Sequence, residues 1–242
     1  MRYAVFSDVH GNLQALRSVL RRMDQLGIGC RICLGDIVGY GGNPNECVEE
    51  TRLSVDRCVA GNHDRAAVGG TSAGHFNPQA QAAVLWTGEV LTEPNRRFLS
   101  GAPLVAQEES IFFVHASPME PSQWHYVVTT ESAERAFERF QERLCLIGHS
   151  HRPLVAAKES DRRCKLSVEA EICLREKLRY VINVGSVGQP RDGDPRASFL
   201  VLDTGEGRAS IERVPYDTAA AGRAILDAGL PASLAERLQH GK

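Results

Sequence analysis

Five short apolar segments of this chain each lead into residues that commonly bind metal ions. The segments are YAVF, RICL, CVA, IFFV and CLI. Aliphatic and β-branched runs of this length, bounded by glycine or polar residues, predict buried strands. The polar residues that follow them are Asp8, His10, Asp36, Asn62, His63, Asp64, His115, His149 and His151. Because loops at the carboxyl ends of strands converge at one edge of an open α/β sheet, these residues predict a single site.

Helices expected between the strands indicate an α/β fold. Asn12 can cap a helix in which apolar residues recur at helical spacing over residues 13–26, ending at Gly27. A second helix is expected near residues 44–53. A third should begin at Pro78 with Asn77 as its cap, and a fourth should span residues 130–144.

Past residue 152 the pattern changes to strands joined by turns. Residues 154–174 predict a hairpin or meander around the polar stretch ESDRR, residues 179–186 another strand, and residues 198–216 a hairpin that turns at residues 205–207. These strands imply a second sheet. Residues 217–240 predict a helical tail, broken by Gly229 and Pro231, that serves packing or an interface. We expect residues 1–242 to form one domain that includes this tail.

Composition excludes several classes of protein. With 242 residues and 43% hydrophobic content, the chain can bury a large core. A net charge of −2 and the lack of long Lys or Arg runs argue against a nucleic acid polymer as partner. The sequence starts with a predicted strand, lacks signal-peptide features, and has no apolar run near about 18 residues. We therefore expect a cytoplasmic protein that does not bind membranes.

The seven cysteines favour reduced thiols, since their number is odd and they are scattered through apolar segments. Cys30 and Cys33 form a CxxC pair, but no second pair follows to complete a zinc site. Cys33 is better interpreted as a small buried residue of a strand.

The metal-binding residues predict two ions rather than one. Asp8-x-His10 and His149-x-His151 are expected to be extended, which would place both side chains of each pair on one side of the chain. Oxygen and imidazole ligands without thiolate suit Mn²⁺, Fe²⁺, Ni²⁺, Zn²⁺ or Co²⁺. The set is too large for one tetrahedral ion, and Asp36, alone at its strand end, is the candidate bridge. Two ions about 3.5–4 Å apart can hold a bridging hydroxide for in-line attack at phosphorus.

Each of these residues also has a structural interpretation when it is taken alone. Asp8 or Asp36 could cap a helix, Asn62 could be a turn residue, and His115 could be a hydrogen-bonded core histidine. As a set they resist that interpretation, because a core does not tolerate converging imidazoles and carboxylates unless a cation compensates them.

The motifs closely resemble those of the calcineurin-like metallophosphoesterases. They are D-x-H at residues 8–10, G-D-x-x-G at 35–39, G-N-H-D at 61–64, the lone His115, and G-H-x-H at 148–151. All occur in order within residues 1–153, a combination far more specific than any single motif. The later segment INVGSVGQPRDGDPRASF resembles the closing part of the small bacterial and archaeal phosphodiesterases. The resemblance implies a four-layer αββα sandwich of two mixed β-sheets flanked by helices.

Carried over by position, the resemblance implies a role for each site residue. The first ion would be held by Asp8, His10, Asp36 and His151, and the second by Asp36, Asn62, His115 and His149. It leaves His63 without a metal, facing the substrate, where as an imidazolium it donates a hydrogen bond to a phosphoryl oxygen or protonates the departing alkoxide. Asp64 is the candidate to orient His63. We expect Mn²⁺ to be the favoured ion.

The expected function is hydrolysis of small phosphodiesters or phosphomonoesters. Arg191 is a candidate phosphate contact by its bidentate geometry, and His125 is a candidate to line the substrate cleft with Trp124 and Tyr126. Two alternatives stay open: a nucleotide-anhydride hydrolase of the dinucleoside tetraphosphatase type, and a non-catalytic metal-binding scaffold of the same fold. A homo-oligomer through strand edges or the C-terminal helices is compatible with the sequence.

Overall fold

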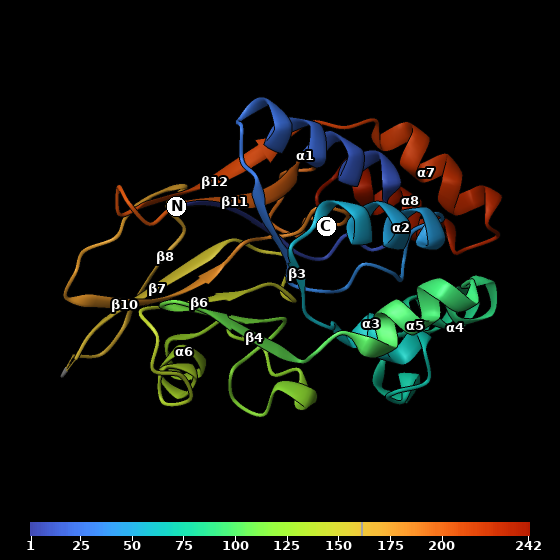
Figure 1. Cartoon of the computed structure of the whole chain (residues 1–242). Helices are drawn as coiled ribbons and strands as arrows, with labels where there is room; N and C mark the ends of the chain where they lie inside the picture. The colour runs from blue at the N-terminus through green and yellow to red at the C-terminus, as the bar shows by residue number, and fades with distance from the viewer. Residues whose placement is uncertain (161) are drawn as a thin grey trace.

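Two mixed sheets form the centre of the computed structural model, which describes residues 1–160 and 162–242 (Figure 1). Within these residues the first sheet has the order β3-β2-β1-β11-β12-β9 and the second the order β4-β5-β6-β10-β7-β8. The strands of the first sheet are β1 (Arg2–Phe6), β2 (Cys30–Cys33), β3 (Arg57–Cys58), β9 (Glu171–Cys173), β11 (Ala197–Asp203) and β12 (Arg208–Val214). Those of the second are β4 (Val105–Glu108), β5 (Ile111–Val114), β6 (Leu144–Ile147), β7 (Leu154–Glu159), β8 (Lys165–Ser167) and β10 (Leu178–Asn183).

Both faces of the first sheet are buried, as alternation along β1 makes clear. Tyr3 and Val5 point into the core between the two sheets, whereas Ala4 and Phe6 point to the core beneath the helices. All four side chains are fully buried. Since strand side chains alternate with period two, a continuous apolar run is what a strand covered on both faces requires.

Helices cover the outer face of each sheet and complete four layers (Figure 1). The longer helices are α1 (Leu13–Gln25), α2 (Pro44–Ser54), α4 (Pro78–Val90), α5 (Glu93–Gly101) and α7 (Thr218–Asp227). The shorter ones are α3 (Asn62–Ala67), α6 (Thr130–Phe137) and α8 (Ala232–Glu236), with single turns η1 (Ala73–His75), η2 (Pro121–Gln123) and η3 (Arg237–Gln239). Helices α1 and α2 pack on the first sheet and α6 packs on the second. The expected αββα sandwich is confirmed.

Several local predictions are confirmed. Asn12 Oδ1 accepts a hydrogen bond from the Ala15 amide at 3.1 Å, and Asn77 caps α4 in the same way with Pro78 at its first position. Strands β11 and β12 form the expected antiparallel hairpin. Gly229 and Pro231 separate α7 from α8, and these helices pack against each other and against Tyr40.

The helix predicted over residues 130–144 is too long, because α6 ends at Phe137. Arg179, on the neighbouring strand β10, donates hydrogen bonds to the carbonyl groups of Phe137 at 3.2 Å and Glu142 at 3.1 Å. These long-range bonds satisfy carbonyl groups that would otherwise need a continuing helix. Helix α5 was not predicted.

The strands after residue 152 are divided between both sheets, so they do not form a second sheet by themselves. Strands β7 and β8 pair antiparallel, as the predicted hairpin requires, but β9 pairs with β12 and lies in the first sheet. Asp161, in the predicted ESDRR turn, lies outside the described residues. In the part of the chain that the structure describes, no helix is long and apolar enough to span a bilayer.

Candidate metal centre

The predicted ligands gather at one end of the sandwich. Asp8 and His10 follow β1, Asp36 follows β2, Asn62 opens α3, His115 follows β5, and His149 and His151 follow β6. Each is at most 8% exposed. Both sheets therefore contribute side chains to one buried cluster, as the strand-end argument predicts.

The backbone at this cluster is not extended, so that part of the sequence prediction is wrong. Asp8, His10, Asp36, His149 and His151 all have positive φ, between +51° and +65°. A left-handed backbone costs a residue other than glycine roughly 1–2 kcal/mol. The chain turns at each of these ligands, and His149 and His151 reach different groups of neighbours.

Hydrogen bonds from distant segments hold the first of these turns. The Asp8 amide donates to the Gly35 carbonyl at 3.0 Å, and the Asp8 carbonyl accepts from the Gly188 amide and the Ser186 hydroxyl, each at 2.9 Å. A Cβ at Gly188 would lie 1.8 Å from the Val9 carbonyl oxygen. The late segment of the chain thus clamps the ligand loop, and only glycine permits the close approach.

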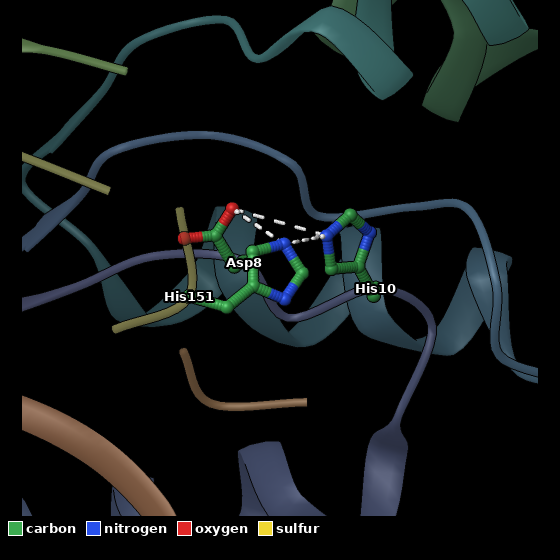
Figure 2. A group of neighbouring side chains, drawn as sticks. All are labelled: Asp8, His10 and His151. Carbon is green, nitrogen blue, oxygen red and sulfur yellow. Dashed lines mark hydrogen bonds and ion pairs between the residues drawn. The ribbon is translucent and has the colours of Figure 1, made fainter. Parts of the chain in front are cut away.

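The first group of ligands consists of Asp8, His10 and His151 (Figure 2). Their facing atoms are close: His10 Nε2 lies 3.0 Å from His151 Nε2, and Asp8 Oδ1 lies 3.8 Å and 3.4 Å from these two nitrogens. The Nδ1 atoms point at carbonyl oxygens, of Val38 for His10 and of Gln189 for His151.

The carbonyl contacts fix the tautomers of both rings. Because a carbonyl only accepts, each Nδ1 carries the proton, and two Nε2 lone pairs face each other. Asp8 Oδ1 is buried and has no hydrogen-bond donor among the described residues. Lone pairs that converge in this way repel one another unless a cation lies between them, so these residues fit a divalent ion.

The second group consists of Asp36, Asn62, His115 and His149. His115 Nδ1 donates to the Leu34 carbonyl at 2.8 Å, which directs Nε2 toward the other members of the group. Nε2 lies 3.2 Å from both Asn62 Oδ1 and His149 Nδ1, and 3.3 Å from Asp36 Oδ2. Two oxygens and two nitrogens suit a transition-metal ion of borderline hardness.

Asp36, a member of the second group, also lies close to His10 of the first. Its Oδ2 lies 3.6 Å from His10 Nε2 as well as 3.3 Å from His115 Nε2. Its Oδ1 accepts a hydrogen bond from the His63 amide at 2.8 Å. One oxygen thus faces both ligand groups while the other fixes the start of α3, which is the geometry expected of a bridging carboxylate.

Burial and mutual charge shift the titration of the whole cluster. Burial lowers the pKa of His149 to about 3 and holds the pKa of His10 and of His151 well below the ordinary value, so these rings offer lone pairs at pH 7. Burial raises the pKa of Asp8 to about 7. Burial also acts to lower the pKa of His115, but the Asp36 carboxylate raises it to about 9. The carboxylates thus attract positive charge, which a bound ion would supply in place of a proton.

Asp64 does not orient His63 as the sequence suggested. Its carboxylate accepts hydrogen bonds from the amides of Asp36 at 2.8 Å, Ile37 at 2.9 Å, Val38 at 3.2 Å and Gly61 at 3.0 Å. Burial raises its pKa to about 6, and the Asp36 carboxylate acts in the same direction. With its acceptors directed at these amides, Asp64 is a positioning residue for the loop that carries Asp36.

His63 lies close enough to His10 and Asp36 to form a third group of possible ligands. It also lines a pocket of about 550 Å³ together with Asn62 and His149. Its ring centroid is 4.7 Å from that of His10, and its Nδ1 has no hydrogen-bond partner among the described residues. Burial lowers its pKa to about 4, so the free protein carries a neutral imidazole at pH 7 rather than the expected imidazolium.

Of the two residues predicted to contact the substrate, Arg191 lies beside the ligand cluster and His125 lies outside the pocket. Arg191 donates to Gln189 Oε1 at 2.8 Å and to the Tyr40 hydroxyl at 3.3 Å, and its amide bonds the His151 carbonyl. His125 is absent from the lining of the His63 pocket; its side chain is 42% exposed and contacts Glu120. Tyr126 rather than His125 reaches the pocket.

Sequence reasoning missed two kinds of functional residue. The carbonyl groups of Leu34, Val38 and Gln189 set the histidine tautomers, yet no sequence pattern marks a carbonyl. Tyr40 and Phe76 form pocket walls beside His63. Tyr40 could have been found, because it lies in the glycine-rich loop that follows Asp36. Phe76, in a long connection, carries no such signal.

Comparisons with known proteins identify the family and the fold. A family model described as "Calcineurin-like phosphoesterase superfamily domain" matches residues 1–207. The "Uncharacterized protein MJ0912" of Methanocaldococcus jannaschii is 41% identical over 99% of this chain and 98% of that protein. A metallophosphoesterase structure from Sphaerobacter thermophilus is 37% identical and superposes with a TM-score of 0.88, covering 100% and 99% of the two chains. The hypothetical protein PH1004 from Pyrococcus horikoshii OT3, 21% identical, shares the fold with a TM-score of 0.81, covering 100% of this chain and 98% of its own.

Strand-end histidines and carboxylates on a two-sheet sandwich define a metallophosphoesterase site, and the sequence matches extend over nearly the whole chain. The protein belongs to the calcineurin-like phosphoesterase superfamily.

Proposed function

We propose that this protein is a dinuclear metal-dependent phosphoesterase that hydrolyses small phosphodiesters faster than phosphomonoesters. One observation carries the proposal: Asp36 Oδ2 lies within 3.6 Å of His10 Nε2 and within 3.3 Å of His115 Nε2. A carboxylate oxygen shared by two ligand groups favours two adjacent ions over one. Two ions bound there would polarise the phosphoryl oxygens and supply a hydroxide nucleophile at neutral pH.

His63 is the residue that we assign to the leaving group. It is the first residue after the ligand Asn62, and its amide is held by Asp36 Oδ1 at 2.8 Å. Its neutral ring carries one N–H, which can donate to a phosphoryl oxygen or to the departing alkoxide. A dianionic transition state beside the ring would raise its pKa and make it a better acid.

We favour Mn²⁺ among the ions that the ligand set accepts. The three candidate oxygen ligands, from Asp8, Asp36 and Asn62, suit a hard ion, while the four imidazoles keep Fe²⁺, Ni²⁺, Zn²⁺ and Co²⁺ within range. We favour diesters because a diester carries two ester groups: one can be the leaving group while the other occupies the pocket beside His63.

A substrate panel tests the proposal. It comprises bis-para-nitrophenyl phosphate, para-nitrophenyl phosphate, cyclic nucleotides and dinucleoside polyphosphates, each with Mn²⁺, Ni²⁺ or Mg²⁺. We expect kcat/KM for the para-nitrophenyl diester with Mn²⁺ to exceed that for the monoester at least about tenfold, which corresponds to roughly 1.4 kcal/mol. Equal or reversed preference contradicts the phosphodiesterase assignment.

Two results of the same panel would select the alternatives. Fastest turnover of dinucleoside polyphosphates would assign the protein as a nucleotide-anhydride hydrolase. Two bound ions per chain with no turnover of any substrate would assign a non-catalytic scaffold.

A further inference from the structure

The pocket beside His63 has aromatic walls that touch the metal centre. We call it the aromatic pocket, defined by Tyr40, Phe76, Trp124 and Tyr126. Tyr126 stacks on His149, with centroids 4.2 Å apart and planes at 25°, and Phe76 lies 4.6 Å from His63. Tyr40 and Trp124 lie 4.7 Å from His10 and 5.9 Å from His115. A substrate with its phosphate at the ligand clusters must therefore extend between these rings.

The aromatic pocket has no acidic or strongly basic residue in its described lining, and the ionisable side chains there other than tyrosine are His63, His75 and His149. Its other residues include Thr71, Ser72, Asn77, Ser122 and Gln123, and no Lys, Arg, Asp or Glu is found among the described residues that line it. A charged group bound there would lose water without gaining a partner of opposite charge. The pocket thus suits an uncharged group that combines flat apolar faces with hydrogen-bonding edges.

Basic residues lie instead around a separate pocket. Arg191 lines it with Arg152, Arg237 and Lys242. The guanidinium of Arg191 is turned onto Gln189 and Tyr40 and does not line the aromatic pocket. Arg191 therefore contacts the aromatic pocket only at Tyr40, whose ring centroid lies 5.6 Å from the guanidinium carbon, and it does not enter the lining.

Two of the aromatic residues are held in an unfavourable backbone conformation. Tyr40 has φ +59° and Trp124 has φ +56°. Bulky residues rarely adopt this region, and such outliers concentrate at sites that bind ligands. The fold thus fixes these two rings against a local preference, which is expected of walls that a ligand stacks on.

We propose that the aromatic pocket binds the nucleobase of the substrate, so that the natural substrate is a phosphodiester of a nucleoside. The inference rests on the proposed function, because the phosphate must lie at the metal centre. A volume of about 550 Å³ accommodates a base with its sugar. Stacking between side-chain rings accepts any base, while Asn77, Ser72 and Gln123 offer amide and hydroxyl groups to its edges.

Binding to the Mn²⁺-loaded protein, measured by calorimetry, tests this without turnover. The ligands are inorganic phosphate, ribose 5-phosphate, phenyl phosphate, adenosine 5′-monophosphate and adenosine 3′,5′-bisphosphate. We expect adenosine 5′-monophosphate to bind roughly 5- to 140-fold tighter than ribose 5-phosphate, the range that stacking one base provides. It should also bind tighter than phenyl phosphate, and the bisphosphate should bind more weakly than the monophosphate.

Substitutions in the aromatic pocket test whether it causes the tighter binding of adenosine 5′-monophosphate. Tyr126→Ala and Trp124→Ala should bring the affinities for adenosine 5′-monophosphate and ribose 5-phosphate close together while leaving metal content and phosphate affinity unchanged. Tyr126→Phe should keep the preference, because it keeps the ring. Val128→Ala, at an exposed apolar residue of the same segment, is the matched control and should behave as the wild type.

Each contrary outcome has a distinct meaning. Equal binding of adenosine 5′-monophosphate and ribose 5-phosphate overturns the nucleobase proposal while diester hydrolysis still stands. Phenyl phosphate that binds as tightly as adenosine 5′-monophosphate overturns the nucleoside assignment in favour of aryl esters, and tighter binding of the bisphosphate contradicts a pocket suited to an uncharged group. If neither phosphate binding nor hydrolysis occurs, the proposed function fails and this inference fails with it.

Discussion

Asp36 uses its two carboxylate oxygens for different purposes. Oδ2 faces the histidines of both ligand groups, whereas Oδ1 accepts the His63 amide. A Cβ at Gly61 would lie 2.0 Å from Oδ1, so the neighbouring backbone leaves no room for any other residue there. At the scale of single residues, Asp36 therefore has two roles: it is the proposed bridge between the ions, and it also positions the proposed acid, His63.

His63→Ala should reduce turnover without removing metal. Loss of a general acid typically lowers kcat by about 10²- to 10⁴-fold. No predicted ligand is removed, so elemental analysis should still find the wild-type Mn²⁺ content. His240→Ala, at an exposed histidine, is the control. A His63→Ala protein that lost its metal would show that His63 is a ligand.

Asp64→Asn should impair metal binding and stability together. The carboxylate accepts four backbone amides, and the amide group of asparagine can accept through one oxygen only. Each buried amide left unpaired costs about 1–3 kcal/mol, and the loop that carries Asp36 would shift. Urea unfolding and Mn²⁺ stoichiometry measure both effects. Unchanged stability and metal content with lost turnover would restore the catalytic role predicted from sequence.

At the scale of the elements, the loop after β2 determines where His63 can lie. Gly39 has φ +90°, and a Cβ on it would lie 2.4 Å from His63 Nδ1. The loop after β2 and the start of α3 therefore pack closely against each other at Gly39 and His63. Only glycine satisfies both the backbone conformation and the close approach.

Gly39→Ala should displace the His63 ring and reproduce much of the His63→Ala defect. We expect kcat to fall at least about tenfold, because a general acid that is displaced loses its reach to the leaving group. Bound Mn²⁺ should be retained, since no ligand of either group is replaced. The exposed Gly69, also at positive φ but with nothing near its Cβ position, provides the matched control in Gly69→Ala. Equal activity of the two variants would contradict the fit between Gly39 and His63.

Local elements and the clustering of the candidate ligands were predictable from sequence, while the long-range contacts between elements were not. Asn12, Pro78 and the hairpin at residues 205–207 carry local signals that the structure follows. The early end of α6 depends on Arg179, which lies more than forty residues after Phe137. The division of late strands between two sheets likewise depends on partners that strand periodicity does not specify. The left-handed backbone at the candidate ligands could not be predicted from sequence, because residues other than glycine rarely adopt positive φ.

At the scale of the whole molecule, the metal centre joins the two sheets. Asp36 follows a strand of the first sheet, and His115 and His151 follow strands of the second. Without a cation, buried lone pairs and carboxylates from both sheets face one another. Bound ions should therefore stabilise the packing of one sheet on the other.

Adding Mn²⁺ to metal-depleted protein should raise its Tm. At a free concentration of about 100 times Kd, one ion stabilises the folded state by about 2.7 kcal/mol. For a domain of this size that corresponds to a rise of roughly 5–11 °C. Differential scanning calorimetry measures the shift, and Asp36→Asn, which removes the negative charge of the shared ligand, should show a smaller one. An equal rise in both proteins would contradict the shared position of Asp36.

The clamp that holds His151 and the Asp8 loop comes from residues 186–189, late in the chain. In a nascent polypeptide Asp8 and His10 leave the ribosome first, yet the cluster of candidate ligands cannot be completed until Gln189 has emerged as well. Loading with metal is then a late event in biosynthesis, which follows the assembly of strands rather than guiding it.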